Sequence, residues 1–268
     1  MTPIVGYPSM TVLGTDIVRV STMHIDHAFR HVLRGPGVVS DRRFVRLITG
    51  ESHPFGNMAI VSDPADLPGT EAAIEPLLHC GAPASIMFTG PVSASVGDRL
   101  KGAGFESHGE MPAMAVDIDS LIPTGLPTGY SFTRIGSGPE GDEWAEAFSA
   151  GYELPRGVGD VFSPNAVHAT MVGDASIQYF AIRKNERLVC TSFAYLADGV
   201  AGIYCVATLP EERGKGLGAH ATAEPLRLVR KLGYRVGVLQ SSPAGHSVYR
   251  KLGFSDVGEV PLYVRMPG

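Results

Sequence analysis

Apolar and polar residues alternate with the period of a β-strand along much of the C-terminal half of the chain. YSFTRI (130–135) alternates in this way, and two longer apolar segments flank an Asn-Glu turn as the strands of a hairpin do. Two more apolar segments follow. The pattern therefore predicts strands at 130–135, 177–185, 187–198, 199–209 and 234–240.

Helical composition and helix start and stop signals lie between these strands. Residues 140–152 are helical in composition, and 163–173 begins with Ser-Pro and ends at a glycine. A third helix is expected from Gly216 to Gly233, where Pro225 must kink it or cost stability. The apolar face of this third helix comprises Leu217, Ala221, Leu228, Val229 and Leu232. A short helix is expected at 246–254. This order of elements predicts an α/β fold with a mixed sheet.

The two halves of the chain end in similar segments. DRLKGAGFESHGEMPAMAV (98–116) and SVYRKLGFSDVGEVPLYVR (247–265) align on their Gly-Phe pairs. In that alignment a glutamate and a proline also match, Glu110 with Glu259 and Pro112 with Pro261. Both segments are typical of a short helix, a Gly-Phe exit and a final strand. We interpret the match as a tandem duplication.

A linker separates the two predicted lobes. Residues 117–131 contain two prolines and two glycines in a polar setting, which is typical of a domain boundary. The predicted division is a lobe at 1–120, a linker at 121–129 and a lobe at 130–268.

Composition narrows the class of protein. The 268 residues are 44% hydrophobic and 18% charged, which indicates a folded protein, and no apolar run reaches the roughly 18 residues that span a membrane. A net charge of −5 without a block of basic residues gives no reason to expect a nucleic-acid partner. Three scattered cysteines without a CxxC pair favour a reducing compartment and argue against a structural metal. We therefore expect a cytoplasmic protein without a metal or a membrane anchor.

The segment VATLPEERGKGLGAHA (206–221) places alternating glycines between a strand and a helix. Free amides at a helix N-terminus bind anions, and glycines let the backbone approach a ligand closely. A P-loop needs GxxxxGK followed by Ser or Thr, and a dinucleotide fingerprint needs GxGxxG; neither spacing occurs here. An ordinary polar helix entrance with glycines for turning remains the alternative if this loop is taken alone.

Two motifs together resemble those of the GCN5-related N-acetyltransferase (GNAT) superfamily. The first is Arg213, Gly216 and Gly218 after the turn that contains Pro210, and the second is the helix end Tyr249-Arg-Lys-Leu-Gly-Phe. The resemblance covers residues 130–268 directly and the first lobe only through the repeat. It implies a mostly antiparallel central sheet with flanking helices, and transfer of an acetyl group from acetyl-CoA to a primary amine.

The resemblance also implies where the cofactor binds. The strand 201–208 would pair with the pantetheine arm, with a backbone amide near Val206 receiving the thioester carbonyl, and the loop 213–219 would hold the pyrophosphate. Many members carry Asn where this chain has Ser242, so that contact is a variation. The cofactor-binding residues predicted in this way are Val206, Thr208, Arg213, Gly214, Lys215, Gly216, Leu217, Gly218, Ala219 and Ser242.

The catalytic residues follow from the same resemblance. Tyr249 would protonate the departing CoA thiolate. The attacking amine must lose a proton, because an alkylamine with a pKa near ~10 is mostly protonated at neutral pH. Glu153 is the preferred base, and the alternatives that remain open are Asp160, His168, Asp198 and a water relay.

The first lobe lacks the cofactor motifs. It has Leu100 at the position of Tyr249, and no Arg-x-x-Gly-x-Gly follows its strand in 57–69. We expect it to cover the sheet of the second lobe and to shape the substrate cleft. The expected function is a small-molecule N-acetyltransferase, monomeric or homodimeric. The alternatives are an acetyl-CoA-binding sensor without turnover and, with less support, an enzyme that acetylates a protein amine.

Overall fold

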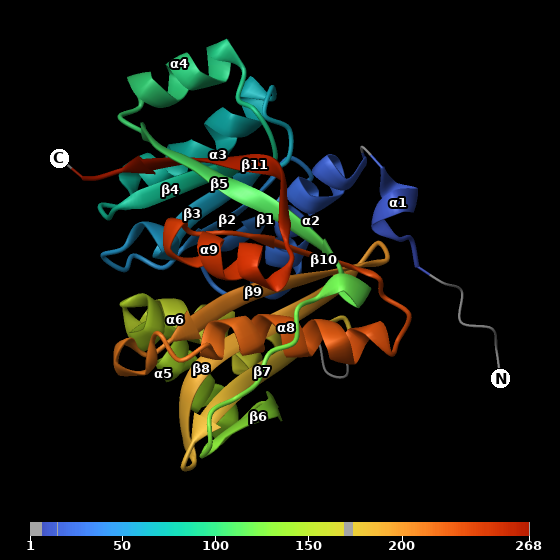
Figure 1. Cartoon of the computed structure of the whole chain (residues 1–268). Coiled ribbons are helices and arrows are strands. Elements are labelled where there is room, and N and C mark those ends of the chain that lie inside the picture. Colours follow the sequence, from blue (N-terminus) through green and yellow to red (C-terminus); the bar gives the residue numbers. More distant parts are fainter. Residues whose placement is uncertain (1–6, 15, 169–173, 268) are drawn as a thin grey trace.

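The computed structural model describes residues 7–14, 16–168 and 174–267. Within this part of the chain, 11 strands form one continuous sheet with helices on both faces (Figure 1). The strands are β1 (Val38–Ser40), β2 (Phe44–Ile48), β3 (Asn57–Val61), β4 (Ala84–Phe88), β5 (Glu106–Asp117), β6 (Tyr130–Ile135), β7 (Ile177–Lys184), β8 (Arg187–Ala197), β9 (Val200–Thr208), β10 (Val236–Gln240) and β11 (Ser255–Arg265).

The helices lie in two layers. They are α1 (Met10–Leu13), α2 (Asp16–Val32), α3 (Leu67–His79), α4 (Ala94–Gly102), α5 (Pro139–Tyr152), α6 (Arg156–Phe162), α7 (Pro164–His168), α8 (Leu217–Arg230) and α9 (Pro243–Leu252), with 3-10 turns η1 (Pro54–Gly56), η2 (Ile118–Ser120) and η3 (Pro210–Glu212). One large core joins α2, α5 and α6 to one face of the sheet. The cores under α3 and α4 and under α8 and α9 lie on the other face.

The sheet confirms the predicted fold class. Its order is β1-β2-β3-β4-β11-β5-β10-β9-β8-β7-β6, and the ladders are antiparallel except for the pairs β3–β4 and β9–β10. No helix of the described residues is long and apolar enough to cross a membrane.

The two halves of the chain exchange their last strands. β5, which ends the N-terminal half, pairs with β10 of the C-terminal half, whereas β11 pairs with β4 of the N-terminal half. β5 and β11 also pair with each other at the centre of the sheet, where Figure 1 shows them crossing between the two sets of helices. The N-terminal half therefore extends the edge of the C-terminal half's sheet, and α2 packs across the central strands.

The β5–β11 ladder pairs the two segments that are similar in sequence, 98–116 and 247–265. Glu110 pairs with Pro261, Met111 with Val260, and Pro112 with Glu259. Each glutamate thus lies opposite the other segment's proline, which is the arrangement that a local two-fold axis between antiparallel strands produces. This symmetry supports the proposed duplication.

Several predicted boundaries need correction. The sequence pattern missed α6. The helix predicted at 163–173 is present as α7 over Pro164–His168, and residues 169–173 lie outside the described part. The last helix begins at Pro243, three residues earlier than expected, because Ser242 caps it. Leu228 and Leu232, expected on the buried face of the helix, are 36% and 55% exposed. The buried face of α8 includes Leu226 and Val229, and Leu232 follows the end of the helix at Arg230.

Candidate active site

The sheet opens between β9 and β10. These parallel strands pair only from Val200 to Gly202, although β9 continues to Thr208 and β10 to Gln240. Cys205 has a φ of 52° at a register shift in the β8–β9 ladder, so β9 carries a bulge just beyond the last pair. Among the described residues, no strand lies beside the β9 edge after Gly202, which therefore offers backbone groups to an extended ligand.

The glycine loop ends in a helix start without a side-chain cap. Gly214 and Gly216 have φ values of 78° and 79°, and Gly216 is the N-cap of α8. Within the described residues, the N–H groups of 214–219 donate no hydrogen bond to the protein. Six consecutive free amides at the positive end of a helix dipole form a site for an anion. These amides belong to the predicted residues Gly214, Lys215, Gly216, Leu217, Gly218 and Ala219.

Gly218 lies beside the strand residues predicted to bind the same cofactor. A Cβ atom built on Gly218 would lie 3.8 Å from both the Thr208 hydroxyl and a Val206 methyl group. Thr208 in turn lies 3.2 Å from the sulfur of Cys190. The structure therefore brings the loop, Val206 and Thr208 to one place at the mouth of the opened sheet.

The side chain of Arg213 points away from the free amides. It donates to the Gly151 carbonyl at 2.8 Å and lies 3.5 Å from the Glu153 carboxylate, so it fastens the loop to the end of α5. Gly151 itself abuts β9, because a Cβ there would lie 2.9 Å from the Ala207 Cβ atom. Arg213 thus helps to hold the loop and is not aimed at the anion site.

Tyr249 lies on the α9 side of the opening. Burial, with the nearby Cys190 thiol as a smaller cause, raises the pKa of Tyr249 to about 12, although a hydrogen bond with Thr222 opposes the shift. Its ring packs over Gly245, where a Cβ would lie 2.9 Å from a ring carbon. The phenol therefore keeps its proton throughout the neutral pH range and is a potential donor.

Tyr152 is a second phenol near the opening, which sequence reasoning missed. It is the last residue of α5, and its ring lies 5.3 Å from that of Phe148. Burial raises its pKa well above the ordinary value, with Tyr249 and Cys205 as further causes, yet the residue is 45% exposed. A raised pKa and a partly exposed side chain are compatible if one side of the Tyr152 ring faces an open cleft and protein surrounds its other sides. No motif marks this position in the sequence.

The predicted bases are exposed and have partners. Glu153 is the C-cap of α5 with a φ of 58°, and its side chain is 71% exposed beside Arg213. Asp160 pairs with Arg156 at 2.8 Å, and Asp198 accepts from His27 at 3.2 Å. The side chain of the fourth candidate, His168, lies outside the described part. Among the described candidates, none shares a hydrogen bond with Tyr249.

Ser242 starts α9 and has a local partner. Its hydroxyl oxygen accepts from the Gly245 N–H at 3.2 Å and caps the helix. The hydroxyl proton remains available, so a contact with a cofactor is compatible with this role.

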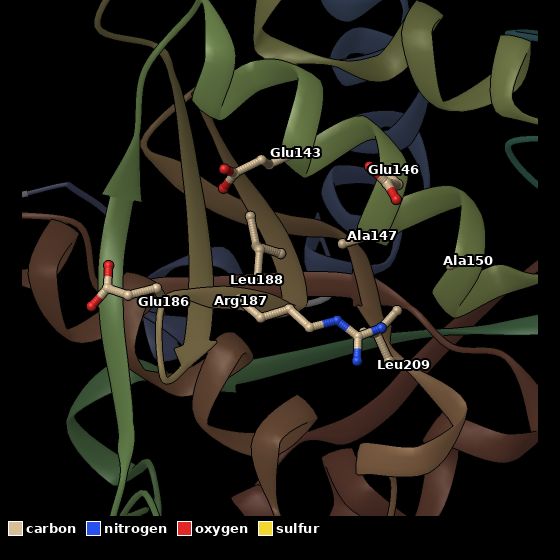
Figure 2. Close-up of a pocket in the computed structure, with 8 residues that line it drawn as sticks. All are labelled: Glu143, Glu146, Ala147, Ala150, Glu186, Arg187, Leu188 and Leu209. Carbon is tan, nitrogen blue, oxygen red and sulfur yellow. The ribbon is translucent and has the colours of Figure 1, made fainter.

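A separate hollow of 230 Å³ lies between α5 and the β7–β8 turn (Figure 2). The Glu143, Glu146 and Glu186 carboxylates surround it, and Arg187, which pairs with Glu211, crosses its mouth. None of its lining residues is a predicted cofactor contact.

The N-terminal half has a closed counterpart of the site. β3 and β4 pair in parallel along four consecutive positions, from Met58 to Val61, so this pair does not open. The helix that follows, α3, is capped by the Asp66 carboxylate, which accepts from the Gly69 N–H. A carboxylate at this position repels an anion, and Leu100 replaces the phenol. The two halves therefore differ at the strand pair, at the helix start and at the phenol position.

The opened parallel pair, the free-amide loop and the protonated phenol all lie in the C-terminal half of the chain. A sequence profile for the acetyltransferase (GNAT) family matches residues 142–254. This match covers less than half of the chain, and it identifies residues 142–254 as a GNAT-type acetyltransferase domain. Among curated protein sequences, none matches the chain.

Solved structures share the fold across both halves. A GCN5-related N-acetyltransferase from Kribbella flavida is 22% identical, with a TM-score of 0.63 over 94% of this chain and 96% of its own. One from Sphaerobacter thermophilus is 14% identical, with a TM-score of 0.60 over 97% and 94%. A tandem GNAT protein from the clavulanic acid biosynthesis pathway is 14% identical, with a TM-score of 0.53 over 96% and 95%. Their nearly full coverage shows that the N-terminal half is part of the shared architecture.

Proposed function

We propose that the protein transfers an acetyl group from acetyl-CoA to the primary amine of a small molecule at the opening between β9 and β10. The observation that carries this proposal is the row of free amides at 214–219 beside the unpaired edge of β9. Acetyl-CoA supplies an activated thioester, an extended pantetheine amide chain and a pyrophosphate, which match the edge and the loop.

The loop and the β9 edge would bind different parts of acetyl-CoA. The amides of the loop bind the pyrophosphate, and the β9 edge at Val206 and Thr208 pairs with the pantetheine amides. The bulge at Cys205 lies directly before Val206, whose amide would donate to the thioester carbonyl. Most of the rate enhancement comes from holding the amine and the thioester together, an effect on the order of 7 kcal/mol or more.

Tyr249 is the proposed acid. A phenol with a pKa of about 12 stays protonated at neutral pH and donates its proton to the departing thiolate. Glu153, the C-cap of α5, is the proposed base, and its exposed carboxylate would act through water.

The acetyl group passes directly to the amine in this proposal. Cys190 and Cys205 are the thiols nearest the opening, and burial raises the pKa of Cys190 to about 12 and that of Cys205 well above its usual range. Such thiols remain protonated and are poor nucleophiles, so a covalent acetyl-cysteine is disfavoured. The proposed location is the cytoplasm, which the three free cysteines favour, and the proposed state is a monomer or homodimer without a nucleic-acid partner.

A thiol-release assay with acetyl-CoA and a panel of amines tests this function. We expect amine-dependent release of CoA, lowered about a hundredfold in Tyr249→Phe, which is the low end of the range for a general acid. Acetyl-CoA binding without release against any amine would instead favour the sensor. The matched control is Tyr263→Phe, which removes a hydroxyl from β11 where the ring packs against Phe88 of the N-terminal half, and it should leave the rate unchanged.

A further inference from the structure

The carboxylate of Glu212 joins three side chains at the base of the glycine loop. One oxygen accepts from the Lys184 ammonium at 2.9 Å, and the other accepts from the Lys215 ammonium at 2.7 Å and from the Tyr130 hydroxyl. The Glu212 side chain is 7% exposed, because these partners themselves cover it. We call these four residues the Glu212 cluster.

The Glu212 cluster links the loop to the edge of the sheet. Tyr130 and Lys184 lie directly opposite each other in the β6–β7 ladder. Glu212 ends η3 just before the loop, and Lys215 lies inside the loop between two glycines with positive φ. Glycines allow many backbone conformations, and the loop N–H groups make no hydrogen bond among the described residues. The Lys215 side chain is therefore a principal restraint on the middle of the loop.

The direction of the Lys215 side chain also bears on its predicted role. Its ammonium group is engaged by Glu212, the Tyr130 hydroxyl and the Glu211 carbonyl. The amide of Lys215 donates no hydrogen bond within the described part of the chain, whereas its charge is already paired. Lys215 would thus serve the anion site mainly through its backbone, and its side chain would serve the shape of the loop.

We propose that Glu212 is a positioning residue that holds the free amides of the loop in the geometry that binds the pyrophosphate of acetyl-CoA. The inference rests on the proposed function. The positioning role and the charge of Glu212 have opposite effects on affinity. A carboxylate close to a bound anion would by itself weaken binding. If Glu212 positions the loop, its removal weakens binding even though a repelling charge is lost.

Glu212→Gln and Glu211→Gln form a matched pair for the test. Both remove one negative charge beside the loop, but Glu211 is exposed and pairs only with the exposed Arg187 among the described residues. For Glu212→Gln we expect the calorimetric Kd of acetyl-CoA and its KM to rise about tenfold, as for a lost charged hydrogen bond, with kcat at saturating acetyl-CoA unchanged. For Glu211→Gln we expect unchanged or tighter binding.

Tyr130→Phe is a second variant, which changes no charge and should leave strand β6 intact. It removes one hydroxyl from the Glu212 cluster, and we expect a rise of about threefold in the Kd of acetyl-CoA. In ligand-free protein we also expect trypsin to cleave after Lys215 faster in Glu212→Gln than in Glu211→Gln.

The outcomes separate this inference from the proposed function. If the parent protein binds acetyl-CoA and Glu212→Gln binds it equally well or more tightly, the positioning role is wrong and the proposed function stands. Equal tryptic cleavage in the two variants would also contradict it. A fall in kcat with an unchanged KM would overturn the positioning role and assign Glu212 to the chemical step. If the parent binds no acetyl-CoA, the proposed function and this inference both fail.

Discussion

At the scale of single residues, the environment of each side chain decides its chemistry. Tyr249 and Tyr152 lie on either side of the opening, and burial keeps both phenols protonated. Glu212 has the opposite environment: hydrogen bonds from Lys215, Tyr130 and Lys184 lower its pKa to about 2. The site thus combines neutral donors at the reacting end with a permanently charged carboxylate under the loop.

The pH profile should separate the acid from the base. Because the pKa of Tyr249 is about 12, its proton is lost only far above neutral pH, and activity should not fall between pH 7 and about 10. The value of kcat/KM should rise over that range as the acceptor amine loses its proton. Steady-state rates with one fixed amine measure this. A fall in kcat with a midpoint near pH ~8 in the parent that is absent in Tyr249→Phe would contradict the assignment of the acid.

The sequence predicted which residues gather at the site better than it predicted what their side chains touch. The motifs predict Gly216, Gly218 and Tyr249 at one cofactor site, because such motifs encode a local backbone shape. The side chain of Arg213 instead binds the Gly151 carbonyl, 62 positions away in the sequence. That of Lys215 binds a cluster that includes Tyr130. Contacts of this kind depend on packing between distant segments, which spacing alone does not reveal.

At the scale of elements, the opening depends on where two strands stop pairing. The composition of β9 and β10 predicted two buried strands, but not that their ladder ends at Gly202 and Val238. The bulge at Cys205 was equally hidden, since cysteine has no preference for a positive φ. The helix α6 was missed because its seven residues include two glycines and too few turns for a periodic pattern.

Two glycine substitutions test the packing of these elements. A Cβ at Gly202 in β9 would lie 2.5 Å from the Nδ1 atom of His24, which is 1% exposed, so Gly202→Ala should lower the free energy of unfolding by about 1–3 kcal/mol. A Cβ at Gly97 in α4 meets nothing within 4 Å, and Gly97→Ala should raise it by about 0.4–1 kcal/mol. Urea unfolding measures both. Equal effects of the two changes would contradict the packing of α2 on β9.

At the scale of the whole molecule, strand exchange makes the halves depend on each other. The repeat between 98–116 and 247–265 predicted two similar lobes, and we retain a tandem duplication as a proposal. The similarity does not show which half of the sheet each last strand joins, however. The two strands have similar hydrophobic patterns, so either could pair with either half. The exchange places β11 between β4 and β5, and β5 between β11 and β10. The first lobe therefore extends the sheet of the second at its edge.

The halves should consequently fail to fold alone. Residues 1–120 lack β11, which leaves β4 without one of its partners, and residues 121–268 lack β5 beside β10. Exposed strand edges favour aggregation, so we expect each half to be insoluble or unfolded and the co-expressed pair to form a soluble 1:1 complex. Size-exclusion chromatography and circular dichroism measure this. Cooperative unfolding of residues 121–268 by themselves would show that the exchange is dispensable.

The most direct test of the central claim is a calorimetric titration of acetyl-CoA into the parent protein and two variants. A Cβ at Gly218 would make only ordinary van der Waals contacts, at 3.8 Å from Val206 and Thr208, so Gly218→Glu should fold and place a carboxylate in the anion site. Gly97→Glu adds the same charge at an open position on α4. We predict one binding site in the parent and in Gly97→Glu, and no measurable binding in Gly218→Glu. Equal binding by all three proteins would contradict the placement of acetyl-CoA at the glycine loop.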